Sequence, residues 1–239
     1  MRVVIPSKGR VESCARAARL FYDPLIVVRE DEVEEYSALG RELLAHPMDV
    51  RGIGPLKRWI LANVPDETVV IVDDDVSKVY TLVGQRKRTI VRPDSIAQIL
   101  ANAETIARAL DTPVFGFNQA WDVRKFVPQD PLHFYGWTGS VVGIIGREIN
   151  YDPNLLLRAD IDLCLQAMRK WRTVFIDQRF SFVHDRFEGR GGNAHMRSKK
   201  RNERELRYLQ EKWGKWLRVQ ETKTTTRLVV KVKRRQWVN

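Results

Sequence analysis

The sequence predicts an α/β fold in which helices flank a mainly parallel β-sheet. Short apolar runs rich in valine and isoleucine alternate with longer segments whose apolar residues recur at helical spacing. This alternation is typical of a parallel sheet, because parallel strands need crossover segments between them. At 239 residues with 44% hydrophobic content, the chain is long enough to bury a full core of this kind.

Several apolar runs are interpreted as buried strands: Val3 to Ile5, Leu25 to Val28, Val69 to Val72, Val114 to Phe117, Val141 to Ile145 and Val174 to Ile176. Helices are predicted between several of them, with Pro55 in the first turn of one and Pro93 at the start of another. Ligands of such sheets bind beyond the carboxyl ends of the strands. The residues that follow each run are therefore the first candidates for chemistry.

The last part of the chain is expected to form a basic helix and a strand. Leu206, Leu209, Trp213 and Trp216 recur at a spacing that gives the helix one apolar face. Apolar and basic residues then alternate within residues 224–238, as they do in a strand. We therefore predict a catalytic domain over residues 1–196 and a C-terminal extension over residues 197–239 that packs on it.

The net charge of +11 is concentrated in this extension. Residues 197–239 hold 15 Lys and Arg against 4 Asp and Glu, whereas residues 1–196 hold 26 of each sign. Clustered cations favour a polyanion such as nucleic acid, because neutralising phosphates requires many charges in one place. The alternative is a solvated tail that only aids solubility, and we favour the nucleic-acid interpretation.

Composition argues against a secreted or membrane-spanning protein. The two cysteines, Cys14 and Cys164, lie far apart in helical patterns and are expected to be small buried residues, not a disulfide framework. No stretch approaches the roughly 20 apolar residues that a membrane span needs. We expect a cytoplasmic protein.

Three consecutive aspartates follow the apolar run at Val69 to Val72. If the strand continued through them, Asp73 and Asp75 would point to one side and Asp74 to the other. Asp73 and Asp75 are therefore candidate ligands of one Mn²⁺ or Mg²⁺ ion, which would bridge the protein to a diphosphate. Asp74 would face away from this ion, and we assign it to the bound nucleotide. The alternative is an acidic turn that caps the next helix.

A second acidic segment contains Asp160, near the start of a predicted helix. The helix dipole favours an ionised carboxylate there, which would serve as a general base for an acceptor hydroxyl. Helix capping is the alternative role. His184 follows another apolar run and is a candidate third metal ligand, although a lone histidine is more often structural.

Further polar segments suit a nucleotide and its phosphates. They are the loop with Pro6, Ser7, Lys8 and Arg10, the helix start with Lys57 and Arg58, and the glycine-rich Gly191, Gly192 and Asn193. The glycine-rich segment lacks a full phosphate-loop pattern, so its signal is weak.

Taken together, these motifs resemble the GT-A glycosyltransferases over residues 1 to about 196. The resemblance implies a GT-A type, Rossmann-like sheet and a metal site at Asp73, Asp75 and His184. It also implies that Glu30 meets the base or ribose. Asp160 takes the position of the family's catalytic base, although Ala159 replaces the usual glutamate beside it.

More narrowly, the chain is similar to the TET-associated glycosyltransferases of bacteriophages. The similarity lies in residues 5–10, residues 52–58, the triple aspartate and residues 191–194. That family is associated with adding sugars to hydroxymethylated cytosine in phage DNA. The resemblance implies a nucleotide-sugar donor, a DNA acceptor and a phage protein located in the host cytoplasm.

The acceptor side is assigned to aromatic and basic residues. Trp121 and Trp137 are candidates for stacking on the acceptor base, although aromatic residues are more often core. Phosphate contacts are assigned to Lys199, Lys200, Arg201, Lys231, Lys233, Arg234 and Arg235.

We therefore predict transfer of a sugar from a UDP-sugar to 5-hydroxymethylcytosine in DNA. Alternatives are a glycosyltransferase acting on a cell-surface or lipid-linked glycan, a nucleotidyltransferase, and a non-catalytic nucleic-acid binder. The oligomeric state is left open.

Overall fold

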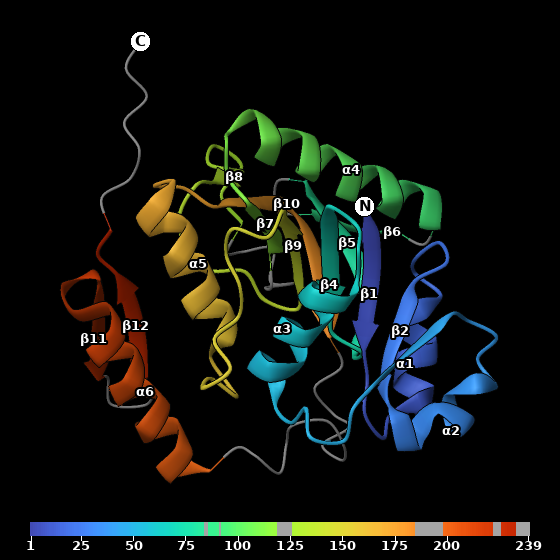
Figure 1. The fold of residues 1–239 in the computed structure, drawn as a ribbon. Coiled ribbons are helices and arrows are strands. Elements are labelled where there is room, and N and C mark those ends of the chain that lie inside the picture. Colours follow the sequence, from blue (N-terminus) through green and yellow to red (C-terminus); the bar gives the residue numbers. More distant parts are fainter. Residues whose placement is uncertain (84–85, 91, 119–125, 185–197, 222–225, 233–239) are drawn as a thin grey trace.

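A computed structural model describes residues 1–83, 86–90, 92–118, 126–184, 198–221 and 226–232 (Figure 1). The described residues form a ten-stranded sheet with the order β3-β2-β1-β4-β9-β7-β10-β5-β6, and β8 pairs with β10 off this path. The strands are β1 (Arg2–Pro6), β2 (Leu25–Arg29), β3 (Leu43–His46), β4 (Thr68–Val72), β5 (Val76–Val83), β6 (Arg86–Ile90), β7 (Val114–Asn118), β8 (Leu132–His133), β9 (Val141–Ile145) and β10 (Phe175–His184).

Helices cover both faces of this sheet, as the predicted α/β class requires. They are α1 (Val11–Ala18), α2 (Val33–Ser37), α3 (Ile53–Asn63), α4 (Pro93–Ala109), α5 (Ala159–Lys170) and α6 (Lys199–Trp213), with short 3₁₀ helices at Glu30–Glu32 and Gly214–Trp216. Buried residues of α1, α2 and α4 share one apolar cluster. Those of α3, α5 and α6 share the cluster on the other face.

Strand β4 shows why apolar runs form the centre of the sheet. All five of its residues are buried. Val69 and Ile71 belong to the cluster with α3 and α5, while Val70 and Val72 belong to the cluster with α1 and α4. A strand covered on both faces needs apolar β-branched residues at every position, which is the pattern that predicted it.

The sheet is mixed, with its parallel strands interrupted by β9. β1 pairs in parallel with β2 and β4, β2 with β3, and β7 with β10. β9 runs antiparallel between β4 and β7, and β5 runs antiparallel to β10 and β6. The β5–β6 hairpin lies directly after the triple aspartate, where the sequence showed no apolar run of the kind we used to predict strands.

The C-terminal segment packs on the outer side of α5 (Figure 1). After α6 the chain forms a two-stranded sheet of β11 (Leu217–Glu221) and β12 (Thr226–Val230). Leu206, Leu209 and Val230 are buried in the same cluster as the α5 residues. The division of the chain at residue 196 stays a prediction, although the helix and strand expected in this region are present. Within the described ranges, no helix is long and apolar enough to cross a membrane.

Candidate active site

Three parallel strands, β1, β4 and β10, end at the same edge of the sheet. Asp73 follows β4 there, and its N–H donates to the Ser140 carbonyl at 2.8 Å. The Ser140 hydroxyl in turn lies 3.0 Å from His184 Nδ1 at the end of β10. His184 is paired with Val76, the first residue of β5. The end of β10 and the aspartate run are therefore joined through Ser140 and Val76.

The triple aspartate does not extend the strand as we expected. β4 ends at Val72, and Asp74 and Asp75 lie in a turn before β5. The alternating orientation predicted for a strand is therefore wrong. Asp74 and Asp75 both approach the Arg10 guanidinium, at 3.1 and 3.7 Å.

A buried polar network fixes the loop after β1 against this turn. The Ser7 hydroxyl donates to Asp74 Oδ2 at 2.7 Å and lies 2.7 Å from the Tyr36 hydroxyl. Tyr36 also accepts from the Arg10 N–H at 3.0 Å. Burial raises the pKa of Asp74, while the Ser7 hydroxyl and the Arg10 charge act in the opposite direction. Asp74 therefore has a structural role, because it holds the first loop in place.

On the other side of the turn, Lys57 forms an ion pair with Asp160. Lys57 Nζ donates to Asp160 Oδ1 at 2.8 Å. Lys57 is only 1% exposed, whereas the Asp160 side chain is 25% exposed. Burial, which would lower the pKa of Lys57, is outweighed by the carboxylates of Asp160 and Asp73, so its pKa is raised. We expected Lys57 to face the nucleotide sugar, and the structure gives it this buried partner.

The first turn of α3 lies directly against the loop that precedes α5, and this contact brings Lys57 to Asp160. The Gly54 N–H donates to the Leu155 carbonyl at 3.1 Å. A Cβ atom on Gly54 would lie 2.1 Å from the Leu155 oxygen and 2.4 Å from the Asp152 oxygen. Glycine is therefore required for α3 to pack this closely.

Tyr151 and Cys164 line the buried side of the ion pair. The Lys57 ammonium lies 5.4 Å from the centre of the Tyr151 ring. Burial and then the Asp160 charge raise the pKa of the Tyr151 hydroxyl well above its usual value. Burial likewise raises the pKa of the Cys164 thiol to about 12, so this cysteine is not a nucleophile at neutral pH. Cys14, below the first loop, is buried as well, with a pKa raised to about 12.

Asp73 is the least compensated carboxylate of the site. Burial raises the pKa of Asp73 to about 7 against the opposing charge of Lys57, and the charges of Asp160, Asp75 and Asp74 add to the effect of burial. An additional cation near Asp73 would offset this destabilisation.

The donor set fits a hard divalent cation that arrives together with a diphosphate. Among the described residues no group of three His, Cys, Asp or Glu side chains is already arranged to hold a metal. Carboxylate oxygens are nevertheless the ligands that such ions prefer. Mg²⁺ is commonly bound through one or two carboxylates, with substrate phosphates and water completing its shell. Asp73 and Asp75 supply two such carboxylates, and the charge of Asp75 acts on Asp73.

Other residues assigned to the nucleotide sugar lie around this edge with varied partners. Glu30 Oε1 accepts from the Met48 N–H at 3.1 Å and joins the loops after β2 and β3. Arg58 Nη1 donates to the Tyr151 carbonyl at 3.3 Å. Pro6 is the last residue of β1, and Lys8 lies two residues further, half-buried. Their assignment to the nucleotide stays a prediction.

The residues assigned to the acceptor lie in several places. Trp137 is half-buried and packs against the core cluster that includes α5, which agrees with the core alternative. Lys200 and Lys231 are exposed, and Arg201 lies in the first turn of α6, where its N–H donates to the Ser198 hydroxyl. Several candidates fall outside the described residues: Trp121, Gly191, Gly192, Asn193, Lys233, Arg234, Arg235 and the side chain of Lys199.

Sequence reasoning missed the pairing of Lys57 with Asp160, although one signal was present. Ile53, Lys57, Ile60 and Leu61 follow helical spacing, which places the lysine on the buried face of α3. A buried ammonium needs an anionic partner. No comparable signal pointed to Tyr36, which reaches the first loop from another helix.

Comparison with known proteins identifies the family and the fold of the chain. A family model described as TET-Associated Glycosyltransferase matches residues 1–192. No curated protein matches the sequence. Glucosyl-3-phosphoglycerate synthase from Mycobacterium tuberculosis, solved with Mg²⁺ and uridine diphosphate, is 12% identical with a TM-score of 0.55, over 97% of this chain and 87% of that one. This similarity confirms the predicted GT-A type α/β fold.

Weaker structural matches include two further proteins. The S. aureus TarS fragment 1–349 is 12% identical with a TM-score of 0.47, over 77% of this chain, which spans 60% of that fragment. The mannosyltransferase PcManGT from Pyrobaculum calidifontis, solved with GDP-Man and Mn²⁺, is 12% identical with a TM-score of 0.46, over 77% of this chain and 55% of that one.

Proposed function

The chain belongs to the TET-associated glycosyltransferase family, and we propose that it transfers a sugar from a UDP-sugar to the hydroxyl of 5-hydroxymethylcytosine in DNA. It is a nucleotide-sugar glycosyltransferase, and the proposal concerns its donor, its acceptor and its catalytic groups. The observation that carries the proposal is the cluster of Asp73, Lys57 and Asp160 at the carboxyl edge of the sheet, where ligands of α/β proteins bind.

Asp160 is proposed as the general base. Its carboxylate takes the proton of the acceptor hydroxyl while the hydroxyl oxygen attacks the anomeric carbon of the sugar. The bond from that carbon to the diphosphate oxygen breaks, and its electron pair leaves with the nucleoside diphosphate. Attack opposite to the leaving group inverts the anomeric configuration. Lys57 holds Asp160 from the buried side and leaves the exposed part of the carboxylate to the acceptor.

Asp73 and Asp75, with His184, are proposed to hold a divalent cation. When bound, Mg²⁺ or Mn²⁺ would neutralise the charge of the departing diphosphate. The fold shared with a synthase solved with Mg²⁺ and uridine diphosphate supports both the cation and the uridine nucleotide. Arg10 approaches the same turn and adds a fixed positive charge beside Asp74 and Asp75.

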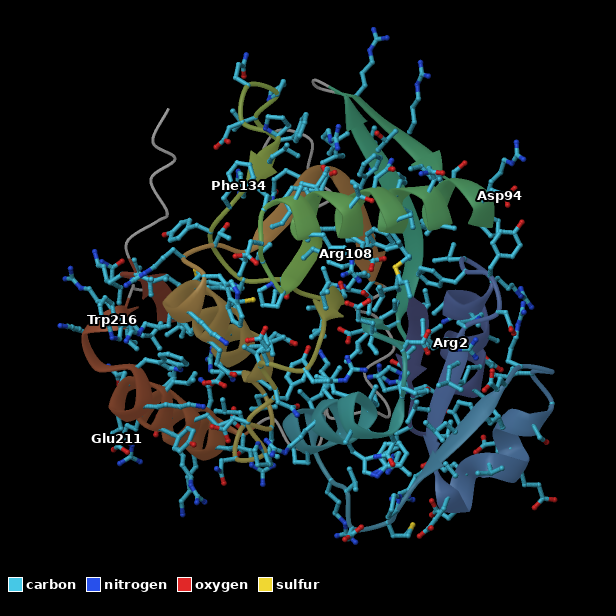
Figure 2. The ribbon with its side chains drawn as sticks, turned by 45° about the horizontal axis from the view of Figure 1, so that its top comes forward. Arg2, Asp94, Arg108, Phe134, Glu211 and Trp216 are labelled. Carbon is cyan, nitrogen blue, oxygen red and sulfur yellow. The ribbon has the colours of Figure 1, made fainter. Side chains whose placement is uncertain are left out.

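The DNA acceptor is supported by the family and by the charge of the C-terminal segment. The matched family is described as TET-associated, and the resemblance of the sequence implies an acceptor of hydroxymethylated cytosine in phage DNA. In the described part of the extension, exposed cations include Lys200, Arg204, Arg207, Lys215, Arg218 and Lys231. Trp216, labelled in Figure 2, is half-buried and packs against the cluster that includes α5, with the Arg169 guanidinium 4.3 Å and the Lys215 ammonium 5.0 Å from its ring. Such a surface suits a phosphate backbone.

The test is incubation of the protein with a panel of nucleotide sugars, Mn²⁺ or Mg²⁺, and DNA with or without 5-hydroxymethylcytosine. After digestion to nucleosides, we expect a mass gain of one sugar on hydroxymethylcytosine alone, with release of nucleoside diphosphate. Modification of unmodified cytosine would overturn the acceptor. Release of pyrophosphate would indicate nucleotidyl transfer and overturn the reaction.

Replacement of Asp160 tests the base separately. D160N should abolish transfer while donor binding, measured by calorimetry, is retained. Arg19→Ala, at an exposed position after α1, is the matched control and should leave turnover unchanged. Full turnover in D160N would exclude Asp160 as the base.

A further inference from the structure

The loop that precedes α5 surrounds the carboxylate of Glu205, which comes from α6. The backbone N–H groups of Leu156 and Leu157 donate to Glu205 Oε1 and Oε2 at 3.0 Å each, and the Arg158 N–H donates to Oε2 at 3.2 Å. Glu205 is only 4% exposed. Three successive N–H groups therefore converge on one buried anion.

The chemistry of this contact is that of an anion-binding loop at the start of a helix. Consecutive N–H groups form a concavity that stabilises a negative charge, and the helix dipole of α5 acts in the same direction. α5 begins at Ala159 with Arg158 as its N-cap residue, and no side chain of the cap makes a capping hydrogen bond. Glu205 supplies the anion from another helix and fixes the chain immediately before α5.

Asp160 lies two residues after the last of these N–H groups. Its carboxylate is held on one side by Lys57, and its backbone is held by the segment that Glu205 fixes. The matched family model ends at residue 192, so the helix that carries Glu205 lies outside it. Sequence separation also concealed this contact, since Glu205 lies 47 positions from Arg158.

We propose that Glu205 is a positioning residue for Asp160, through which the C-terminal helix sets the geometry of the transfer step. The inference rests on the proposed role of Asp160 as base. It gives α6 two roles. Its exposed side carries Lys200 and Arg204, which are proposed for the DNA, and its buried side holds the start of α5 through Glu205. A displacement of about 1 Å in a catalytic group can reduce the rate about 100-fold.

The matched control is Asp152, which anchors α6 to the body at a different place. Asp152 accepts from the Tyr208 hydroxyl at 2.7 Å and from Lys212 Nζ at 2.6 Å. Asp152 Oδ1 also accepts from the Asn154 N–H at 2.9 Å, whereas the N–H groups of residues 156–158 donate to Glu205. D152N therefore weakens the docking of α6 and the turn at Asn154 but removes no acceptor of residues 156–158. If Glu205 only docks the helix, E205A and D152N should have the same effects.

The experiment compares E205A, E205Q and D152N with the wild-type chain and with D160N. For E205A we expect kcat to fall about 100-fold with KM for the donor within about twofold, because the base moves while the donor site does not. E205Q keeps one acceptor oxygen and should recover about tenfold of that loss. D152N should keep kcat within about twofold at a comparable loss of melting temperature.

Amide exchange gives a readout that does not depend on activity. E205A should speed exchange at Leu156, Leu157 and Arg158, while D152N should not. Unchanged exchange, or equal losses of kcat in E205A and D152N, would overturn the positioning role. Turnover is also read as nucleoside diphosphate release with water as acceptor. If the protein hydrolyses its donor but leaves DNA unmodified, the DNA acceptor is wrong, and the effect of E205A on hydrolysis still tests Glu205. Full turnover in D160N would refute Asp160 as the base.

Discussion

Lys57 Nζ lies 2.8 Å from Asp160 Oδ1, and the lysine is almost fully enclosed by protein. Removing only the lysine leaves two carboxylates, Asp160 and Asp73, without their nearest cation. Breaking a buried ion pair by removing one partner destabilises a protein by about 3–5 kcal/mol. We expect K57M to lie at or below the lower end of that range, because a quarter of the Asp160 side chain is exposed.

Denaturant unfolding of K57M, D160N and the double variant measures this coupling. The double variant should be more stable than the sum of the single losses predicts, since it leaves one uncompensated charge fewer. R58M, at the exposed neighbouring position, should be close to wild type. Strict additivity of K57M and D160N would mean that the two groups do not stabilise each other.

Asp73 makes the stability of the metal-free protein depend on pH. Its folded-state pKa, about 7, lies above the ordinary value of 3.8. The folded state therefore binds more protons than the unfolded state between these values, and the free energy of unfolding falls as pH rises from about 4 to about 7. In EDTA at pH 8, D73N should melt higher than wild type by at least about 2–4 °C, the change that about 1 kcal/mol produces in a chain of this size.

The same variant should be unable to transfer sugar, so stability and activity should change in opposite directions. Well below pH 3.8 the stability difference should disappear, because wild-type Asp73 is then protonated in both states. Parallel stability curves for D73N and wild type from pH 4 to 8 would contradict burial as the origin of the raised pKa.

A strand could be predicted from the sequence wherever one continuous run of apolar residues marked it. β4 and β2 are apolar at nearly every position because both faces are covered, so their composition alone identifies them. The direction of β9 was not predictable, since its apolar run suits either orientation and pairing with β4 and β7 decides it. The β5–β6 hairpin was not predicted, because β6 is exposed at four of its five positions and lacks an apolar run.

The sequence indicated which residues are candidates for the site, but it did not show which residues they contact. Asp73 and Asp160 were identified as candidates because carboxylates follow a strand and open a helix. Their partner Lys57 lies 103 positions from Asp160, and the packing of α3 against the loop that precedes α5, at Gly54 and residue 155, brings the two together. The turn at Asp74 and Asp75 replaced the expected strand because the chain reverses there into β5.

Asp152 should make the docking of α6 sensitive to acid. Burial, which would raise its pKa, is outweighed by hydrogen bonds from Lys212, the Asn154 backbone and Tyr208, so the pKa falls to about 2. A folded-state pKa below the ordinary 3.8 gives stability that is present above about pH 4 and is lost as pH falls toward 2. D152N should lose at most about 2 kcal/mol at pH 7 and converge with wild type near pH 2. A constant difference from pH 2 to 7 would show that the charge of Asp152 is not responsible.

The exposed cations of the extension should determine the salt dependence of DNA binding. Each phosphate contact contributes about 0.9 to the slope of log K against log salt concentration. The variant K200A/K231A should reduce that slope by up to about 2 and weaken binding by a similar factor on every sequence. R19A, at an exposed position after α1, is the control. The slope is measured by fluorescence anisotropy between roughly 50 and 300 mM salt. An unchanged slope would mean that the DNA does not contact Lys200 or Lys231.

Gly54 links the fold to the chemistry, because its missing side chain lets α3 touch the backbone before α5. In G54A the new Cβ meets the Leu155 and Asp152 carbonyl oxygens, which belong to backbone and cannot turn aside. Overpacking of this kind typically destabilises by about 1–3 kcal/mol. The helix must shift, and the Lys57 ammonium shifts with it, so kcat should fall more than donor affinity. G40A is the control, since an alanine there strains the backbone, which has a φ of 60°, but meets nothing within 4 Å of its Cβ. It should lose stability and keep its transfer rate.

If G54A acts by displacing Lys57, it should lower kcat much less in the K57M background than in wild type. An equal effect in both backgrounds would mean that Gly54 influences transfer by another route.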